Sequence, residues 1–484
     1  MENKDNNILK SNIIFGGAQI VQMLATILRA KLIAVFLFST GLGLNAIFQS
    51  ILLTINNVTS CGIMQSGVRE ISNANVNDTP DRLAKILGIF KKLLLLSSCL
   101  GLIICIILSP VLSFFSFGNT SYVLSFALLG FGVAFYTLTH GEMTILQGTR
   151  NITGLAKGTI LGAMLSVIIC VPCYYFLGIN GVLVSIIIGY LSSWLMYLIQ
   201  VRKQNLYFPK VSFKEAVILG RPIIVLGVVL MLGTFLVSFF SYLTNVLIRY
   251  LGSIEDVGYY QGAASITTQS ILVVTSVLAS DFFPRLSALV FNVKEHNKLI
   301  NLQLEIIIWV IAPISVIIIC LADYIIPILL SSEFLVIKPM LQAMSCALLF
   351  RGIWITMSYI ILAHGDRTSY LLYDGLLGNG LNFLLNILGF YFGGLSGIGY
   401  SFVFTSILVC LILFYIVVKL YKYKIDKEVV FTIVTVVPLI FISYFLSKFN
   451  FLYCCIWCVI VVITSIYRLN KKFGIINFSY RKRF

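Results

Sequence analysis

Charge is what this sequence has least of. Only 11% of its 484 residues are Asp, Glu, Lys or Arg, whereas about a quarter are charged in ordinary soluble domains. Hydrophobic residues make up 59% of the chain, and the mean hydropathy is +1.00. Stretches such as Leu93–Leu108 and Val429–Leu446 are, with their flanks, long enough to cross ~30 Å of hydrocarbon as helices. The composition therefore excludes a soluble fold and predicts an all-α, polytopic membrane protein.

Acidic residues are scarcer still, with 18 Asp and Glu against 34 Lys and Arg, so the net charge is +16. A nucleic-acid-binding protein would gather its cations in a stripe with interleaved aromatic residues. Here the cations are dispersed over loops between apolar segments, where they suit an anionic membrane leaflet. We therefore expect membrane lipid, and no nucleic acid, as a partner.

Histidine is nearly absent, with three residues, and the 11 cysteines are scattered through apolar segments. Cys170 and Cys173 have CxxC spacing, and Cys454, Cys455 and Cys458 form a cluster, but no histidine accompanies them. Buried cysteine usually behaves as a small hydrophobic residue. The sequence also lacks the GxxxxGK[ST] motif that binds nucleotide phosphates. We therefore expect no metal, no cofactor and no direct use of ATP.

Hydropathy, glycine, proline and charge together predict about fourteen membrane-spanning helices. They are expected at 11–38, 44–72, 86–116, 121–147, 153–177, 180–201, 216–250, 257–290, 299–330, 338–363, 369–392, 396–420, 429–447 and 451–468. Most loop cations fall in alternate loops, and the other side holds only Arg249, Lys338 and Lys448. Because cytoplasmic loops are enriched in Lys and Arg, we expect both termini in the cytoplasm.

The second half of the chain echoes the first at an offset of about 216 residues, as parallel repeats of transporters do. Gly178–Ser185 corresponds to Gly394–Ser401, and Gly43–Arg69 corresponds to Gly258–Arg285. Both halves hold six predicted helices, which indicates two lobes in a parallel pseudo-twofold repeat that rock about a central cavity. The expected parts are an N-terminal lobe at 1–201, a cytoplasmic linker at 202–215, a C-terminal lobe at 216–424, and an extra helix pair with a basic cytoplasmic tail at 425–484.

Several motifs carry a resemblance over about residues 10–420. They are Gly41–Leu44, Gly67–Glu70, Leu146–Asn151, Asp256–Gly262, Phe283–Ser287 and Leu329–Phe334. In order and spacing the chain resembles polysaccharide-export flippases of the multidrug/oligosaccharidyl-lipid/polysaccharide superfamily, most of all the O-antigen and lipid III flippases. The chain departs from the family in having an extra helix pair, and in having Gln147 where some relatives carry lysine.

The resemblance implies a function in O-antigen and lipopolysaccharide biosynthesis. The protein would move an undecaprenyl-pyrophosphate-linked oligosaccharide from the inner to the outer leaflet of the bacterial cytoplasmic (inner) membrane. Its partners would be that lipid-linked glycan, membrane lipid and other polysaccharide-assembly proteins. The residues themselves indicate a transporter but do not specify this cargo.

Basic residues inside the predicted spans need a use, because a charge near the membrane centre costs ~2.5–3.5 kcal/mol on insertion scales. They are Arg29 and Lys31 in the first span, Arg221 near the inner end of the seventh, where it can reach the headgroups, and Arg351 in the tenth. Arginine can grip a pyrophosphate with several donors. Arg29 and Lys31 are two residues apart, so only one of them can face a cavity. The alternative is that Arg351 forms a structural pair with an acid.

Polar side chains form a stripe on two equivalent spans. Asn45, Gln49 and Asn56 recur at helical spacing on the second span, and Gln261 and Gln269 on the eighth. Such groups suit sugar hydroxyls in a cavity. They equally suit hydrogen bonds between helices, and the sequence leaves both interpretations open.

Carboxylates are few within the spans: Glu142, Asp281 and Asp374 each lie near the cytoplasmic end of a predicted helix. They are candidates for ion pairs or for coupling to a cation gradient. A cation-coupled multidrug exporter of the same fold remains an alternative, although it should carry a deep carboxylate. A membrane polysaccharide polymerase is a further alternative. It would need a sizeable outer loop for catalysis, whereas the predicted outer loops have roughly 3–8 residues. The protein is therefore not expected to be an enzyme.

Overall fold

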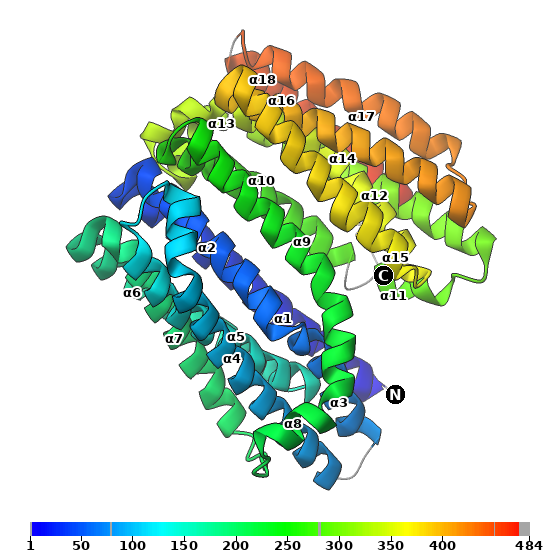
Figure 1. The fold of residues 1–484 in the computed structure, drawn as a ribbon. Coiled ribbons are helices and arrows are strands. Elements are labelled where there is room, and N and C mark those ends of the chain that lie inside the picture. Colours follow the sequence, from blue (N-terminus) through cyan, green and yellow to red (C-terminus); the bar gives the residue numbers. More distant parts are fainter. Residues whose placement is uncertain (1, 78–79, 279–281, 450, 474–484) are drawn as a thin grey trace, which may run out of the picture. The chain divides into compact units, whose positions relative to one another are not determined.

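The computed structural model describes residues 2–77, 80–278, 282–449 and 451–473, and their regular structure is entirely helical (Figure 1). The helices are α1 (Glu2–Phe36), α2 (Phe38–Ser60), α3 (Ile63–Asn77), α4 (Pro80–Phe117), α5 (Val123–Gly148), α6 (Ile152–Leu177), α7 (Gly181–Arg202), α8 (Phe213–Leu219), α9 (Arg221–Leu251), α10 (Ile254–Val277), α11 (Phe283–Ala288), α12 (Val293–Cys320), α13 (Ala322–Leu329), α14 (Lys338–Ala363), α15 (Arg367–Ser369), α16 (Asn379–Tyr421), α17 (Lys427–Leu446) and α18 (Phe451–Phe473). A π-helix, Tyr370–Gly378, leads into α16.

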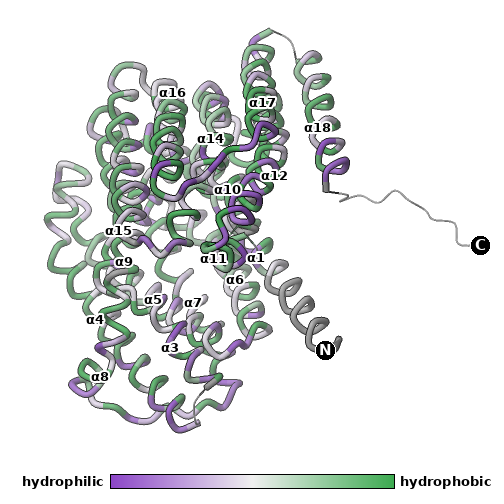
Figure 2. Tube along the Cα trace, turned by 90° about the vertical axis from the view of Figure 1, so that its right-hand side faces the viewer, coloured by the Kyte–Doolittle hydropathy of each residue, from purple (hydrophilic) through white to green (hydrophobic). Residues whose placement is uncertain are grey.

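The described residues contain 11 helical stretches that are long and apolar enough to cross a membrane. Two of these, Ile152–Arg202 and Tyr370–Tyr421, are each bent at a glycine with positive φ, Gly178 in one and Gly394 in the other, and so hold two passes. A helix lies at each of the fourteen predicted positions, and the all-α polytopic class is confirmed. Figure 2 shows long hydrophobic runs along α16 and α17, as membrane passes require.

Some predicted spans are not continuous helices, and those at 216–250 and 299–330 are α8 with α9 and α12 with α13. The span expected at 44–72 is two helices, α2 and α3, separated at Cys61 and Gly62. Both residues adopt positive φ, 46° and 63°, and this left-handed conformation ends a right-handed helix. Hydropathy does not register such a break because the apolar residues continue across it.

Contacts divide the chain into unit 1, Met1–Gly258, and unit 2, Tyr259–Phe484. The division falls later than the linker expected at 202–215, because α9 packs against α2, α3 and α4. Residues 216–258, expected in the C-terminal lobe, therefore lie in unit 1. The parallel six-plus-six repeat stays a prediction.

Glycines allow close backbone contact of α2 and the turn after it with α9 and α10. A Cβ on Gly62 would lie 2.1 Å from the carbonyl oxygen of Gly227 in α9. A Cβ on Gly258 in α10 would lie 1.9 Å from the carbonyl oxygen of Ser39 in α2. Small residues permit this close approach of helices in lipid, where van der Waals packing drives association. These contacts hold α9 and the start of α10 against unit 1.

In unit 2, α12 and α14 carry most of the buried residues, and α16 packs on α14. The last two helices, α17 and α18, both pack on α12. At the end of α18, Lys472 Nζ lies 2.5 Å from Oε2 of the buried Glu305 in α12, and it also pairs with Glu428 in α17. The C-terminal helix pair is thus an integral part of unit 2.

Candidate functional site

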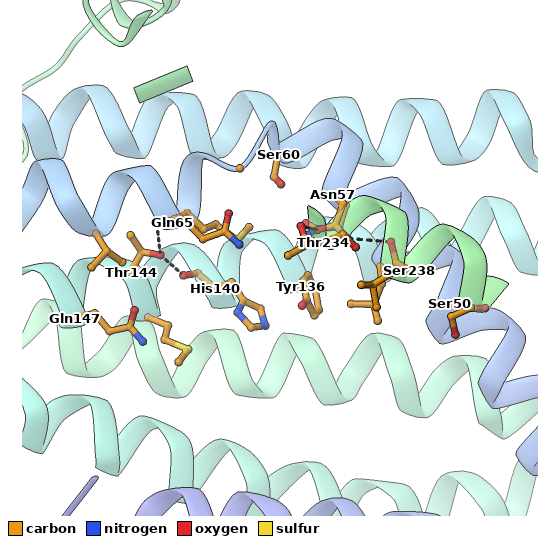
Figure 3. A pocket seen from close by; sticks show the side chains of 18 residues that line it. Ser50, Asn57, Ser60, Gln65, Tyr136, His140, Thr144, Gln147, Thr234 and Ser238 are labelled. Carbon is orange, nitrogen blue, oxygen red and sulfur yellow. Dashed lines mark hydrogen bonds between the residues drawn. The ribbon is translucent and has the colours of Figure 1, made fainter. Parts of the chain in front are cut away.

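A cavity of about 590 Å³ opens within unit 1, between α2, α3, α5 and α9 (Figure 3). None of the 18 residues that line it is Asp, Glu, Lys or Arg. Its polar side chains include Asn56, Asn57, Gln65, His140, Gln147 and Ser238. Amides and hydroxyls of this kind both donate and accept hydrogen bonds. The cavity therefore offers a neutral, hydrogen-bonding surface.

Two neighbouring asparagines of α2 tie the cavity walls together. Asn57 Nδ2 donates to the carbonyl oxygen of Thr234 at 3.2 Å and to Ser238 Oγ at 3.0 Å, both in α9. Asn56 Oδ1 accepts from Thr137 Oγ1 of α5 at 2.9 Å, and Asn56 is buried. Asn56 thus makes an interhelical hydrogen bond and also lines the cavity, so its role in sugar binding stays a prediction. The amide of Gln65 lies on the same wall, on α3 beyond the Cys61–Gly62 break.

One wall of the cavity is aromatic. The rings of Tyr136 and His140, one turn apart on α5, have centroids 4.3 Å apart. Tyr136 also meets Tyr190 of α7 edge to face at 5.1 Å. Tyr190 lies behind this wall, and its hydroxyl donates to Gln49 Oε1 at 3.1 Å. Gln49 thus also makes an interhelical bond, from α2 to α7.

The predicted cations of the first span do not line the cavity. Arg29 is half-buried and interacts electrostatically with Cys170 and Tyr174 of α6 and with Tyr190. Arg29 is not among the residues that line the cavity. Lys31 is half-buried in α1 and is also absent from the cavity lining. Of the other polar residues predicted on α2, Asn45 also lies outside the lining, and its Oδ1 is buried without a hydrogen-bond partner.

Arg351 lies in α14 of unit 2 among aromatic side chains. Its guanidinium carbon lies 5.7 Å from the ring centroid of Trp354 and 5.0 Å from that of Phe402. It also interacts electrostatically with Tyr260 and Asp374. Arg351 therefore has an acidic neighbour, as the alternative of a structural pair requires.

Asp374 occupies the middle of the π-helix. Its Oδ1 accepts from Trp354 Nε1 at 2.5 Å and from Ser358 Oγ at 2.7 Å, so it joins the π-helix to α14. π-Helical turns occur mainly as short insertions and often at functional sites. Arg351, Trp354, Ser358 and Asp374 form one cluster in unit 2, which we call the Asp374 cluster.

The remaining predicted residues have separate surroundings. Glu142 is 1% exposed, and its Oε1 lies 3.7 Å from Nζ of Lys91 in α4, a half-buried side chain, so the two form a partly buried ion pair. Asp281 lies outside the described residues. Gln261 and Gln269 are half-buried in the part of α10 that belongs to unit 2.

Sequence reasoning missed Tyr136 and Tyr190 in the aromatic wall, and Thr234 and Ser238 in α9. The spacing of Tyr136 and His140, and that of Thr234 and Ser238, is four residues, which places each pair on one helix face. That spacing was a usable signal. Which face turns toward a cavity depends on packing between helices and is not visible in one sequence.

The fold and the cavity define a class first: a multi-pass helical membrane transporter. An inward-facing multidrug resistance MATE family transporter of the MOP superfamily is similar, with a TM-score of 0.72 at 15% identity, over 83% of this chain and 94% of that one. The lipid II flippase MurJ in an inward closed conformation is similar, with a TM-score of 0.69 at 18% identity, over 95% of this chain and 99% of that one.

The family is shown by sequence. The model of the polysaccharide biosynthesis protein family matches residues 32–339, more than half of the chain. The lipid III flippases of Escherichia coli (strain K12) and Shigella flexneri are each 22% identical over 372 residues, covering 76% of this chain and 88% of theirs. The chain belongs to the polysaccharide biosynthesis protein family, and it is a transporter of the flippase kind and not an enzyme.

Proposed function

We propose that this protein flips an undecaprenyl-pyrophosphate-linked oligosaccharide, of the O-antigen repeat-unit type, from the inner to the outer leaflet of the bacterial cytoplasmic membrane. The observation that carries the proposal is the cavity of about 590 Å³ in unit 1, whose lining holds amides and hydroxyls among apolar side chains and includes no Asp, Glu, Lys or Arg. Sugar rings present many hydroxyls and no net charge of their own. A lining of amides and hydroxyls matches them, because each group can act as donor or acceptor.

The pyrophosphate needs a positive potential. Arg29, whose charge interacts with Cys170 and Tyr174 of α6, would supply one from outside the cavity lining. A charge in a low-dielectric setting acts over a longer range than in water, so direct contact is not required. In unit 2, Arg351 is the corresponding cation, and Asp374 moderates its charge. An anion that is attracted but not tightly clamped can leave again, as transport demands.

The cavity disfavours the rival multidrug exporter. A cationic drug would call for a carboxylate, and the lining residues include none. The buried Glu142 is already paired with Lys91. We further propose that transport proceeds by alternating access through a rocking motion. Both termini would lie in the cytoplasm, and the protein would act together with other polysaccharide-assembly proteins.

The proposal is tested by charge at Gln147, which lines the cavity from α5. Gln147→Glu keeps the shape and adds one negative charge, which should repel the pyrophosphate and lower glycan export about tenfold or more. Gln147→Lys should keep export near the wild-type rate. The assay is surface glycan in a deletion strain that carries each variant, with lipid-linked repeat units counted on the inner side.

Deletion of the gene should make lipid-linked repeat units accumulate inside. Unchanged export after deletion would overturn the proposed cargo. Wild-type export by Gln147→Glu, together with efflux of a cationic dye, would support the multidrug exporter instead.

Arg351 gives a second test, in unit 2. Arg351→Ala should stop surface glycan synthesis at normal membrane levels, while Arg351→Lys should restore it partly, because the charge survives and the planar set of donors does not. The control is Arg221→Ala, at the start of α9, which we expect to be tolerated. Loss of Arg351→Ala from the membrane would instead identify Arg351 as the structural partner of Asp374.

A further inference from the structure

A second cavity, of about 400 Å³, lies at a different place in unit 1, where the α4–α5 turn meets the α9–α10 turn. Its lining includes Thr40, Phe117, Asn119, Tyr122, Arg249 and Ser253. We call it the turn pocket. It shares no lining residue with the larger cavity.

Aromatic rings form part of the turn pocket. Phe117 and Tyr122 stack with centroids 4.1 Å apart and ring planes 25° apart. Tyr250 also lines the pocket, and the Arg249 guanidinium carbon lies 5.2 Å from its ring centroid. Phe117 is buried in this stack, whereas Tyr250 is exposed and offers a flat apolar face that can pack against the C–H face of a sugar ring.

Arg249 is the only basic residue that lines the turn pocket. Its Nη2 donates to the carbonyl oxygen of Phe117 at 2.5 Å, which holds the side chain in place. A guanidinium carries five N–H donors, so others remain for a ligand. Within the described part of the chain Arg249 has no carboxylate at ion-pair distance. Lys338, another of the three cations in the predicted outer loops, pairs with Asp323 at 2.7 Å.

Carboxylates lie directly behind the lining. Thr40 Oγ1 donates to Glu255 Oε1 at 2.9 Å, and Ser253 Oγ donates to Asp256 Oδ2 at 3.0 Å. A free phosphate or carboxylate would meet these two acids as well as Arg249. A neutral polyol uses both signs, because its hydroxyls accept from the guanidinium and donate to acceptors nearby.

We propose that the turn pocket binds a neutral sugar ring of the glycan that the protein exports. This inference rests on the proposed function, and it adds a second sugar-binding site at the end of unit 1 that the loop charges assign to the outer side. A ring held there would be retained at the outer face after it leaves the larger cavity.

The test uses Asn119→Cys in the full chain, because Asn119 is exposed in the α4–α5 turn. A membrane-impermeant maleimide is applied to cells that make the glycan and to cells that lack the first glycosyltransferase. The parent chain, with its native cysteines, gives the background. We expect labelling to be about threefold slower when the glycan is made, which corresponds to a ligand at twice its dissociation constant.

Arg249→Gln and Tyr250→Leu, each added to Asn119→Cys, should abolish that protection. Loss of one charged hydrogen bond lowers affinity about tenfold. Gln at 249 still offers a donor for the Phe117 carbonyl, and membrane levels of both variants are measured alongside. The matched control is Lys448→Gln. It removes another cation of the predicted outer loops, which lies over the Tyr444 ring in unit 2.

Protection that is equal in both cell types would overturn the inference, since it would report a lipid headgroup or phosphate in the pocket. Failure of the reagent to reach Asn119→Cys would also overturn it. Glycan export is measured in the same cells. If export requires the protein but the labelling rate is the same with and without the glycan, only the sugar site in the turn pocket is contradicted. If export continues without the protein, the proposed function is contradicted.

Discussion

Gly258 shows how much one hydrogen atom in place of a methyl group matters in this fold. Gly258→Ala would put a Cβ 1.9 Å from the Ser39 carbonyl oxygen, a backbone atom that cannot rotate away. Overpacking of this kind costs about 1–3 kcal/mol. We expect a lower thermal midpoint in detergent and lower glycan export, because α2 and α10 must separate.

The matched control is Gly393→Ala, where a Cβ would meet nothing within 4 Å. It should melt close to the wild-type temperature. Equal midpoints for the Gly258 and Gly393 variants would show that α2 and α10 do not touch through their backbones.

Asp366, in the turn after α14, makes a stability prediction that depends on pH. Hydrogen bonds from the backbone and hydroxyl of Ser369, at 3.0 and 2.7 Å, lower the pKa of Asp366 below its ordinary value. Tyr421 adds a third bond at 2.9 Å. A depressed pKa means that the carboxylate stabilises the fold above its unfolded pKa, and that this contribution is lost as pH falls through the folded pKa.

Asp366→Ala should therefore lower stability by about 1 kcal/mol near neutral pH, as loss of a capping side chain does. The difference from wild type should begin to shrink below about pH 4, the ordinary pKa of an aspartate, and should be lost as pH falls through the lower pKa of the folded state. Thermal midpoints of both proteins across pH 3–8 give the comparison. A gap that stays constant down to the lowest pH would mean that the charge of Asp366 is irrelevant.

At the scale of elements, the C-terminal helix pair is held by charge as well as by packing. The Glu305 side chain is 7% exposed and that of Lys472 is 37% exposed. Removing one partner of a buried pair costs about 3–5 kcal/mol, and the exposure of Lys472 places this case at or below the lower end. Lys472→Met alone should therefore lower the thermal midpoint and loosen α18.

The double variant Glu305→Gln with Lys472→Met removes both charges of the pair, so Glu305 no longer leaves an unpaired buried charge, and it should recover most of the loss. Protease sensitivity of α18 gives a second readout. If the double variant were no more stable than Lys472→Met, the pair would contribute nothing, and packing alone would hold α17 and α18 on α12.

At the scale of the whole molecule, the distribution of loop cations predicts the orientation. Reporter fusions after Asn119 and Leu251 should be on the outer side, and those after Gln204 and Lys424 in the cytoplasm. An outer-side reporter is scored by phosphatase activity and a cytoplasmic one by fluorescence. A cytoplasmic result at Leu251 would contradict the assignment of the turn pocket to the outer side.

The positions of the helices could be predicted because hydropathy is a local property that each segment carries by itself. The break at Cys61 and Gly62 could not, since it depends on backbone conformation within a continuous apolar run. The cavity was only partly predictable. Asn56 was identified from its helical spacing, but Arg29 does not line the cavity, because the rotation of α1 is set by its packing on α6 and is not visible in the sequence.

The pairing of Glu305 with Lys472 has a consequence for the synthesis and membrane insertion of the protein. The two residues are 167 positions apart, and the cation is the later one. At about 5–20 residues per second, a ribosome needs roughly ten to thirty seconds to reach Lys472 after Glu305. During that interval α12 has no counter-charge from α18. The nascent chain must keep Glu305 hydrated until Lys472 has been added, so α12 is expected to reach its final depth later than helices that need no partner from α18.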